Sequence, residues 1–209
     1  LQQFGCLPDR KEFRLKYNIK NEEKVITFLG RINAGKGLHL LIDVFVKLTK
    51  EIDNIKLVII GRDDGYLSKT KILVKNYGVQ DKTIFTGPLY GTDKISVFRG
   101  SDIFVFTPIY WEETSAASLE ALACYLPVVS TKQAEIPWLE EYQAGYCVSS
   151  KIEEILLKVK DLINSEERLK LYSRNARKLI EEKYDLKKRI NEIEKDFQLL
   201  TYGKDADNV

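Results

Sequence analysis

Residues 24–50, KVITFLGRINAGKGLHLLIDVFVKLTK, have the pattern of a buried strand that a glycine-rich turn joins to an amphipathic helix. The strand segment is apolar on both faces and rich in β-branched side chains, as expected for a strand that helices cover on two sides. After the turn, Leu38, Leu41 and Phe45 fall on one stripe at helical spacing. The stretch therefore predicts an α/β protein.

Apolar runs of strand length recur along the chain, and segments with helical spacing lie between them. The further runs are KLVIIG (56–61), TIFTG (83–87), DIFVFT (102–107), LPVVST (126–131) and AGYCV (144–148). Such alternation is typical of a parallel sheet with helices on both faces. We predict a Rossmann-like, doubly wound, six-stranded parallel sheet.

From residue 151 onward, charged amphipathic segments predict peripheral helices at the C-terminal end. We divide the chain into a lead-in over 1–22 with one short helix, one domain over 23–200 that includes the C-terminal helices, and a frayed tail over 201–209. The sequence contains no methionine and does not begin with one. We therefore expect a fragment or a processed piece of a longer protein.

The overall charge gives no sign of a polyanionic partner. Lys and Arg number 33 and Asp and Glu number 31, so the net charge is only +2, and we expect no nucleic acid to bind. Cys6, Cys124 and Cys147 are odd in number and lack metal-ligand spacing, which fits a reducing, cytoplasmic compartment. No run reaches the roughly 18 apolar residues of a membrane span. The start of the chain also lacks a signal-peptide core.

The glycine-rich turn nearly spells a P-loop. Gly30, Gly35 and Lys36 match G-x-x-x-x-G-K-[ST], but Gly37 stands where the motif needs a hydroxyl for Mg²⁺. The acid that would complete the metal shell is also missing, because the nearest acids follow a Gly-Arg pair instead of ending a strand. The sequence therefore argues against a P-loop.

The same turn suits an anion by another route. A helix that begins near Leu38 offers unpaired N–H groups and a partial positive charge. Arg31 and Lys36 add two cations, and together these groups suit a diphosphate. The competing interpretation is an exposed basic turn in which glycine serves backbone freedom alone.

A second candidate site lies in residues 110–131, YWEETSAASLEALACYLPVVST, with Glu112 before a short helix and Glu120 inside it. If the strand order is 3-2-1-4-5-6, this segment and the Arg31 turn flank one crevice at the carboxyl ends of neighbouring strands. Carboxylates there would accept hydrogen bonds from sugar hydroxyls. The helix start would offer backbone N–H groups to a phosphate or sugar, those of Thr114, Ser115 and Ala116.

A glycosidase is the competing chemistry, with Glu112 and Glu120 as acid and base. On one helix, the spacing would separate the two carboxylates by roughly 12 Å, beyond the ~6.5 to 9.5 Å of an inverting pair. Because Glu112 is expected in the loop, this distance weakens the glycosidase hypothesis and leaves it open.

The ordered series GRINAGKG, IIGRDDGYL, FTGPLYG, SDIFVF and EETSAASLEALACYLPVVS resembles the C-terminal, donor-binding half of retaining GT-B-fold glycosyltransferases of family 4, also called group 1. The E-x7-E pattern of that family falls on Glu112 and Glu120. The resemblance implies transfer of a hexose from a nucleotide-sugar, with retention at the anomeric carbon. It also implies that Arg31 and Lys36 hold the diphosphate, Glu112 the donated sugar and Glu120 the ribose.

The resemblance implies a donor site in which Arg31, Lys36 and Glu112 act in catalysis. Its members are Gly30, Arg31, Lys36, Gly61, Arg62, Gly87, Leu89, Glu112, Thr114, Ser115, Ala116 and Glu120. The loops that follow Gly61 and Gly87 would border the base. Because the two cations neutralise the leaving diphosphate, we expect no cofactor and no metal ion, only a UDP-, GDP- or ADP-sugar as donor.

The chain also departs from the family pattern in three places. It has Glu113, Thr114 and Ser115 for Gly, Phe and Gly, Tyr125 for the Gly of ACG, and Ala134-Glu135 for Gly-Gly. We expect the acceptor, a sugar or a lipid-linked molecule, and any membrane-surface contact to belong to a missing N-terminal half. This chain alone would bind donor but transfer no sugar.

Two alternatives to the transferase stay open. One is a nucleotide-sugar epimerase or phosphorylase on the same fold. The other is a non-catalytic nucleotide-binding or interaction domain, whose cleft would be filled by a side chain such as Tyr125 or Trp111.

Overall fold

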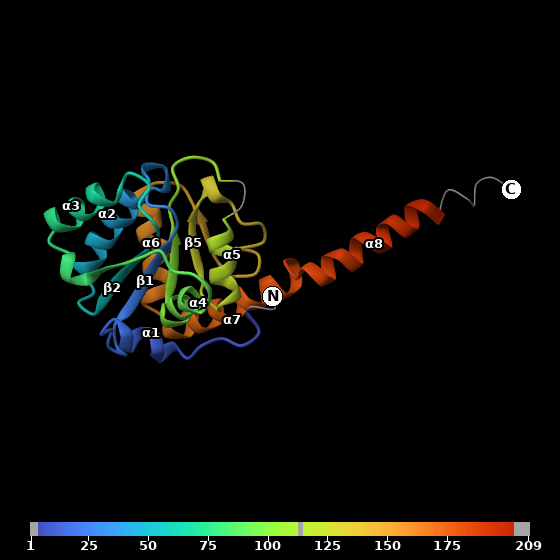
Figure 1. Cartoon of the computed structure of the whole chain (residues 1–209), viewed down its shortest axis with the longest axis horizontal. Helices are drawn as coiled ribbons and strands as arrows, with labels where there is room; N and C mark the ends of the chain where they lie inside the picture. Colours follow the sequence, from blue (N-terminus) through green and yellow to red (C-terminus); the bar gives the residue numbers. More distant parts are fainter. Residues whose placement is uncertain (1–3, 113–114, 203–209) are drawn as a thin grey trace.

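The computed structural model describes residues 4–112 and 115–202, and of residues 199–202 it describes the backbone alone. Its centre is a six-stranded sheet in which every neighbouring pair of strands is parallel. The strands are β1 (Lys24–Leu29), β2 (Ile55–Ile60), β3 (Thr83–Gly87), β4 (Ile103–Phe106), β5 (Val128–Thr131) and β6 (Gly145–Val148). Their order is β3-β2-β1-β4-β5-β6, which confirms the predicted doubly wound parallel sheet (Figure 1).

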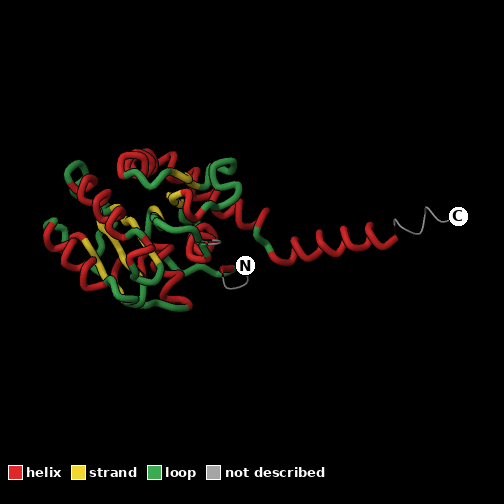
Figure 2. The backbone as a smooth tube through the Cα atoms, turned by 90° about the horizontal axis from the view of Figure 1, so that it is seen from above, coloured by secondary structure: helices red, strands yellow, loops and turns green. Residues whose placement is uncertain are grey.

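Helices cover both faces of the sheet, and Figure 2 shows them on either side of the strands. One face carries α2 (Leu38–Thr49), α3 (Leu67–Asn76) and α6 (Ile152–Ile163). The other carries α4 (Gly91–Gly100) and α5 (Ala116–Ala123), with α1 (Arg10–Lys16) packed on α4 and α7 (Glu166–Lys183) packed on α5. Short 3₁₀ turns span Ala34–Lys36 (η2), Gln80–Lys82 (η3) and Lys132–Ala134 (η4).

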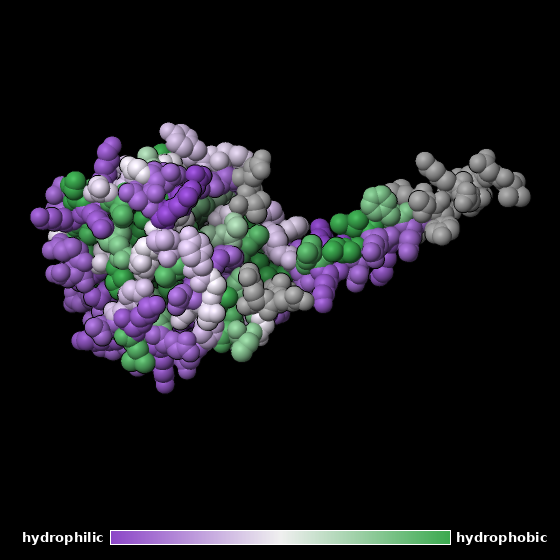
Figure 3. All heavy atoms as spheres, viewed as in Figure 1, coloured by the Kyte–Doolittle hydropathy of each residue, from purple (hydrophilic) through white to green (hydrophobic). Residues whose placement is uncertain are grey.

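The C-terminal helices that the sequence predicts are present, and the last of them, α8 (Leu186–Tyr202), extends away from the body in Figure 1. Leu186, Ile190 and Ile193 of α8 are 68%, 44% and 53% exposed, and Figure 3 shows an apolar stripe along this helix. Because these side chains recur every three or four residues, they share one face of the helix.

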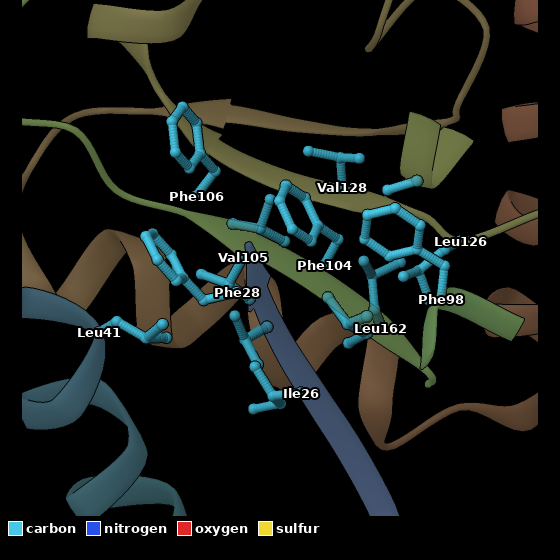
Figure 4. Close-up of a cluster of buried hydrophobic side chains, with 14 of the residues drawn as sticks. Ile26, Phe28, Leu41, Phe98, Phe104, Val105, Phe106, Leu126, Val128 and Leu162 are labelled. Carbon is cyan, nitrogen blue, oxygen red and sulfur yellow. The ribbon is translucent and has the colours of Figure 1, made fainter. Parts of the chain in front are cut away.

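The core forms where both faces of the central strands are covered (Figure 4). The rings of Phe28 on β1 and Phe106 on β4 stack with their centroids 6.0 Å apart. Phe98 of α4 meets Phe104 of β4 edge-on at 5.7 Å. All four side chains are at most 3% exposed, and burying each contributes about 1.5–3 kcal/mol. The aromatic side chains of β4 therefore pack against both α4 and β1.

The N-terminal segment is fastened to the amino edge of the sheet by α1. The buried guanidinium of Arg14 donates hydrogen bonds to the Gly100 carbonyl at 2.9 Å and to Asp102 Oδ2 at 3.1 Å. Burial lowers the pKa of Arg14, while Asp102 favours its charged form. Asp102 also accepts a hydrogen bond from the Val25 N–H at 2.7 Å. The segment before β1 is thus part of the same folded body as the sheet.

Candidate functional site

The candidate site lies at the carboxyl ends of β1 and β4, where the strand order reverses direction. The turn after β1 and the segment after β4 are fastened to each other by two hydrogen bonds. The Ile109 N–H donates to the Gly35 carbonyl at 2.9 Å, and the Thr107 hydroxyl donates to the Gly37 carbonyl at 3.0 Å. The two sequence segments singled out above therefore meet at one edge of the sheet.

Gly37 is required by this contact. A Cβ atom at residue 37 would lie 1.7 Å from the Thr107 carbonyl oxygen, and the backbone φ is +65°. The close approach excludes a side chain, and the left-handed conformation adds backbone strain for any residue other than glycine. The turn therefore cannot carry the hydroxyl of a P-loop without rebuilding the connection to β4.

Lys36 and Glu112 form an ion pair across the two loops. The Lys36 side chain is 12% exposed and the Glu112 side chain 27%. The Lys36 ammonium also lies 5.6 Å from the ring centroid of Phe106, at the end of β4. A carboxylate and an aromatic face thus hold this cation in a fixed, largely desolvated position.

A second cation–carboxylate pair joins α4 to α5. Lys94 Nζ lies 2.6 Å from Glu120 Oε1, and the two side chains are 20% and 22% exposed. Sequence reasoning did not select Lys94. No local signal marks it, because its role depends on the packing of two helices that are separated by a strand in the chain.

Arg31 is placed differently from Lys36. Its side chain is 57% exposed, and Nη1 lies 3.2 Å from Asp64 Oδ2, the same oxygen to which Asn33 Nδ2 donates at 3.0 Å. The exposed guanidinium fork is therefore free to reorient toward an anion. Asp64 and Asn33 are partners that the sequence did not identify.

Asp63, next to Asp64, has a structural task. Its Oδ1 accepts hydrogen bonds from the N–H groups of Leu67, Gly65 and Tyr66 at 3.1, 3.0 and 3.2 Å. These bonds, that from Leu67 first, lower the pKa of Asp63. The two adjacent acids after β2 thus have different contacts. Asp63 accepts hydrogen bonds at the start of α3, and Asp64 pairs with Arg31.

The predicted glycines line up at the carboxyl ends of three adjacent strands. The Gly30 N–H donates to the Ile60 carbonyl at 3.0 Å, and the Gly61 N–H donates to the Gly87 carbonyl at 3.1 Å. A Cβ at residue 61 would lie 1.8 Å from the Gly30 carbonyl oxygen. Arg62 and Leu89 follow these strand ends. Leu89 packs against a second, smaller cluster of buried apolar side chains, which includes Val25 and Val97.

The start of α5 carries the remaining predicted site residues. Ser115 caps this helix, since its hydroxyl accepts a hydrogen bond from the Ser118 N–H at 3.2 Å, and Ala116 is the first helical residue. Thr114 lies outside the described residues, as does Glu113. Within the described part, the site has no group of three or more His, Cys, Asp or Glu side chains that could hold a metal ion.

The two side chains suggested as cleft fillers do not close this site. Tyr125 follows the C-terminal end of α5 and lines a cavity with residues of α4 and α7, at the opposite edge of the sheet. Trp111 is 69% exposed. The hypothesis of a cleft filled by Tyr125 is therefore wrong.

A family model and a curated relative both match this chain to glycosyltransferases. A family model described as "Glycosyl transferases group 1" matches residues 9–179. The "Uncharacterized glycosyltransferase MJ1069" of Methanocaldococcus jannaschii is 27% identical over 190 residues, which make up 90% of this chain and 48% of that protein. This chain thus spans about half the length of that curated relative.

Solved structures show the same fold. The C-terminal domain of a glycosyl transferase group 1 family protein (LpcC) from Francisella tularensis is 26% identical with a TM-score of 0.78, over 88% of this chain and 97% of that one. Anabaena Alr3699/HepE, solved in complex with UDP-glucose, has a TM-score of 0.79 at 18% identity, over 94% of this chain and 54% of that one. Across the described residues, no helix is both long and apolar enough to cross a membrane.

Proposed function

This chain belongs to the glycosyl transferases group 1, and from that membership we propose that it is the nucleotide-sugar-binding domain of a retaining hexosyltransferase of family 4. One observation carries the proposal. Two cation–carboxylate pairs, Lys36 with Glu112 and Lys94 with Glu120, gather at the strand-order switch of a Rossmann-like sheet. Cations suit a diphosphate and carboxylates suit sugar hydroxyls, so the arrangement fits both halves of a nucleotide-sugar.

In this proposal Lys36 and Arg31 bind the diphosphate. Negative charge grows on the diphosphate as the glycosidic bond breaks, and fixed positive groups stabilise that charge more strongly than the ground state. Lys36 is the fixed member, because Glu112 and the Phe106 ring hold it. Arg31 is the adjustable member, since it is exposed and its Asp64 contact can be exchanged for a phosphate. We propose that these two cations replace a metal ion.

The two glutamates then bind hydroxyl groups. Glu112 would accept hydrogen bonds from the donated sugar, because it lies beside the diphosphate cation. Glu120 would accept those of the ribose, with Lys94 holding its carboxylate in place. The backbone N–H groups at the start of α5 would meet the phosphate or sugar from the other side, near Ser115 and Ala116.

The rest of the reaction is assigned to a part of the protein outside this chain. We propose that an additional domain binds a glycan, lipid-linked or small-molecule acceptor in the cytoplasm, with any contact to the inner membrane face made by that domain. This chain alone would bind donor without sustained sugar transfer. The UDP-glucose complex of the fold neighbour HepE supports a UDP-sugar as the first donor to test.

The test is calorimetric titration of the 209-residue chain with UDP-, GDP- and ADP-sugars. Arg31→Ala and Glu120→Ala should both weaken binding of the preferred donor, whereas Lys47→Ala removes an exposed cation on α2 and should leave it unchanged. Unchanged affinity in both site variants would overturn the site. Sustained transfer by this chain alone would overturn the division of labour.

A further inference from the structure

A cavity of about 900 Å³ lies at the amino edge of the sheet, the edge opposite to Lys36 and Glu112. Figure 1 shows α1 and α7 at this edge. It is bounded by the start of β1, the C-terminal ends of α4 and α5, and the first turns of α7. The lining residues that matter here are Lys24, Arg99, Tyr125 and Arg174. Its volume lies in the range of small-molecule pockets, about 300–1,000 Å³.

Tyr125 occupies a backbone position that normally belongs to glycine. The Tyr125 N–H donates to the Leu122 carbonyl at 3.1 Å, and the Leu126 N–H donates to the Ala121 carbonyl at 3.0 Å. This pair of bonds ends α5 in a Schellman motif, in which Tyr125 is the first residue past the helix cap and has φ +64°. A left-handed backbone conformation costs free energy for residues other than glycine. The tyrosine is 39% exposed and lines the cavity, so core packing does not explain why it stands there.

Two guanidinium groups fix the Tyr125 ring. Arg99 and Arg177 lie 5.5 and 5.6 Å from its centroid. They also satisfy the last carbonyls of α5, since Arg99 Nη1 donates to Cys124 at 3.3 Å and Arg177 Nη1 donates to Ala123 at 2.8 Å. Arg99 Nε is buried without a hydrogen-bond partner among the described residues. The ring is therefore a preorganised platform in cationic surroundings.

The charges around the platform leave a positive excess. Of the three acids that line the cavity, Asp102 is bound by Arg10 and Arg14, and Glu166 pairs with Lys170. Glu167 is the third acid. The side chain of Arg174 has no hydrogen bond or ion pair within the described part of the chain. The Lys24 ammonium lies near Glu166 and helps to lower the pKa of that carboxyl after Lys170, its main partner. Arg174 lies one helical turn before Arg177, whose guanidinium is against Tyr125.

We propose that this cavity binds a small molecule in which a phosphate monoester is attached to a sugar or nucleoside ring. Arg174 and Lys24 receive the phosphate, and the ring packs over Tyr125. The site lies across the sheet from the proposed donor site and does not depend on the proposed transferase activity. It would let the domain respond to a phosphorylated metabolite at a distance from the donor.

The experiment is titration of the 209-residue chain with glucose 6-phosphate and with AMP, beside inorganic phosphate. One of the two ring-bearing probes should bind more tightly than phosphate alone. Arg174→Ala should weaken that binding about tenfold, the effect of one charge-assisted hydrogen bond. Tyr125→Gly should also weaken it, although glycine relieves the backbone strain and keeps α5 properly ended. Lys178→Ala removes a cation of α7 that does not line the cavity, and should bind as the parent chain does.

Several results would overturn the proposal. These are no binding of either probe, affinity no better than that of inorganic phosphate, or equal affinity in the parent, Arg174→Ala and Tyr125→Gly chains. A double variant, Arg31→Ala with Lys36→Ala, locates the site. If it abolishes binding of the probe while Arg174→Ala does not, the probe occupies the donor site instead. Thermal unfolding of each variant shows that it is folded.

Discussion

The ammonium of Lys94 lies 2.6 Å from the carboxylate of Glu120, so one ion pair connects α4 to α5 at the carboxyl edge of the sheet. The loop before α4 follows Gly87 and borders the proposed base position, whereas α5 carries Glu120, the proposed ribose-binding residue. The Glu120 side chain is only 22% exposed, and the ion pair holds its carboxylate in one orientation. Lys94 is thus a positioning residue for the proposed ribose-binding group.

Lys94→Met is expected to weaken UDP binding about tenfold, because Glu120 loses a charge-assisted partner while remaining partly buried. Glu120→Ala should weaken it further, since the acceptor itself is then gone. Calorimetric titration with UDP measures both losses. Lys75→Met on α3 removes an exposed lysine and serves as the control. A Lys94→Met chain that binds UDP as the parent does would contradict the positioning role.

Lys36 and Arg31 are expected to contribute unequally to diphosphate binding. Lys36 is 12% exposed and fixed by two neighbours, whereas Arg31 is 57% exposed. Lys36→Ala should weaken UDP binding about 10- to 100-fold, and Arg31→Ala should cost less because an exposed charge is screened by solvent. Affinities in low and high salt provide the measurement. Equal losses in the two variants, at both salt concentrations, would be evidence against this ranking.

Gly37→Ser places a hydroxyl where a P-loop has one and should destabilise the fold instead of creating a metal site. The new Cβ would meet the Thr107 carbonyl oxygen, and the residue would keep φ +65°. Gly78→Ser is the matched control, because Gly78 has φ +69° but nothing within 4 Å of its would-be Cβ. The control should lose about 1–2 kcal/mol from backbone strain, and Gly37→Ser clearly more. Urea unfolding compares the two, and similar losses would show that the contact with Thr107 is unimportant.

Alkaline pH is expected to destabilise the fold through Cys124. Burial raises the pKa of Cys124 from its ordinary value of 9.0 to about 12. Above pH 9.0 the unfolded thiol ionises while the folded thiol keeps its proton, so the unfolded state binds fewer protons. The contribution of this group to the free energy of unfolding is therefore complete below that pH and falls as pH rises toward about 12.

Urea unfolding on both sides of the unfolded thiol pKa tests this expectation. Cys124→Ala should show a smaller alkaline loss of stability than the parent chain. Cys6→Ala, which replaces an exposed thiol, should lose as much stability at alkaline pH as the parent chain does. An alkaline loss that is the same in all three chains would assign the effect to other groups, such as Tyr146, whose pKa burial also raises.

The sheet and the meeting of two loops could be predicted because each depends on local pattern plus one topological rule. Strands that are apolar on both faces and alternate with helices leave little choice of fold. Once β1 and β4 are neighbours, their following loops must lie side by side. The strand pattern and the strand order are therefore enough to predict that the Lys36 and Glu112 segments lie at one edge of the sheet.

The partners of the site residues could not be predicted, because they depend on packing between elements far apart in the chain. Lys94 reaches Glu120 only through the packing of α4 beside α5, and Asp64 reaches Arg31 only because β1 and β2 are adjacent. The expectation that Tyr125 fills the site cleft is wrong for a related reason. The helix α5 carries the chain from one edge of the sheet to the other, so a residue 13 positions after Glu112 lies on the opposite side.

The contact between Gly37 and the Thr107 carbonyl also limits how this turn can evolve. A single substitution would complete the P-loop spelling, yet the shape of the neighbouring connection does not accept it. This turn and a P-loop are therefore close in sequence, yet no tolerated single substitution converts one into the other. A descendant that acquired the hydroxyl would first have to move the chain after β4, and with it the glutamate that pairs with Lys36.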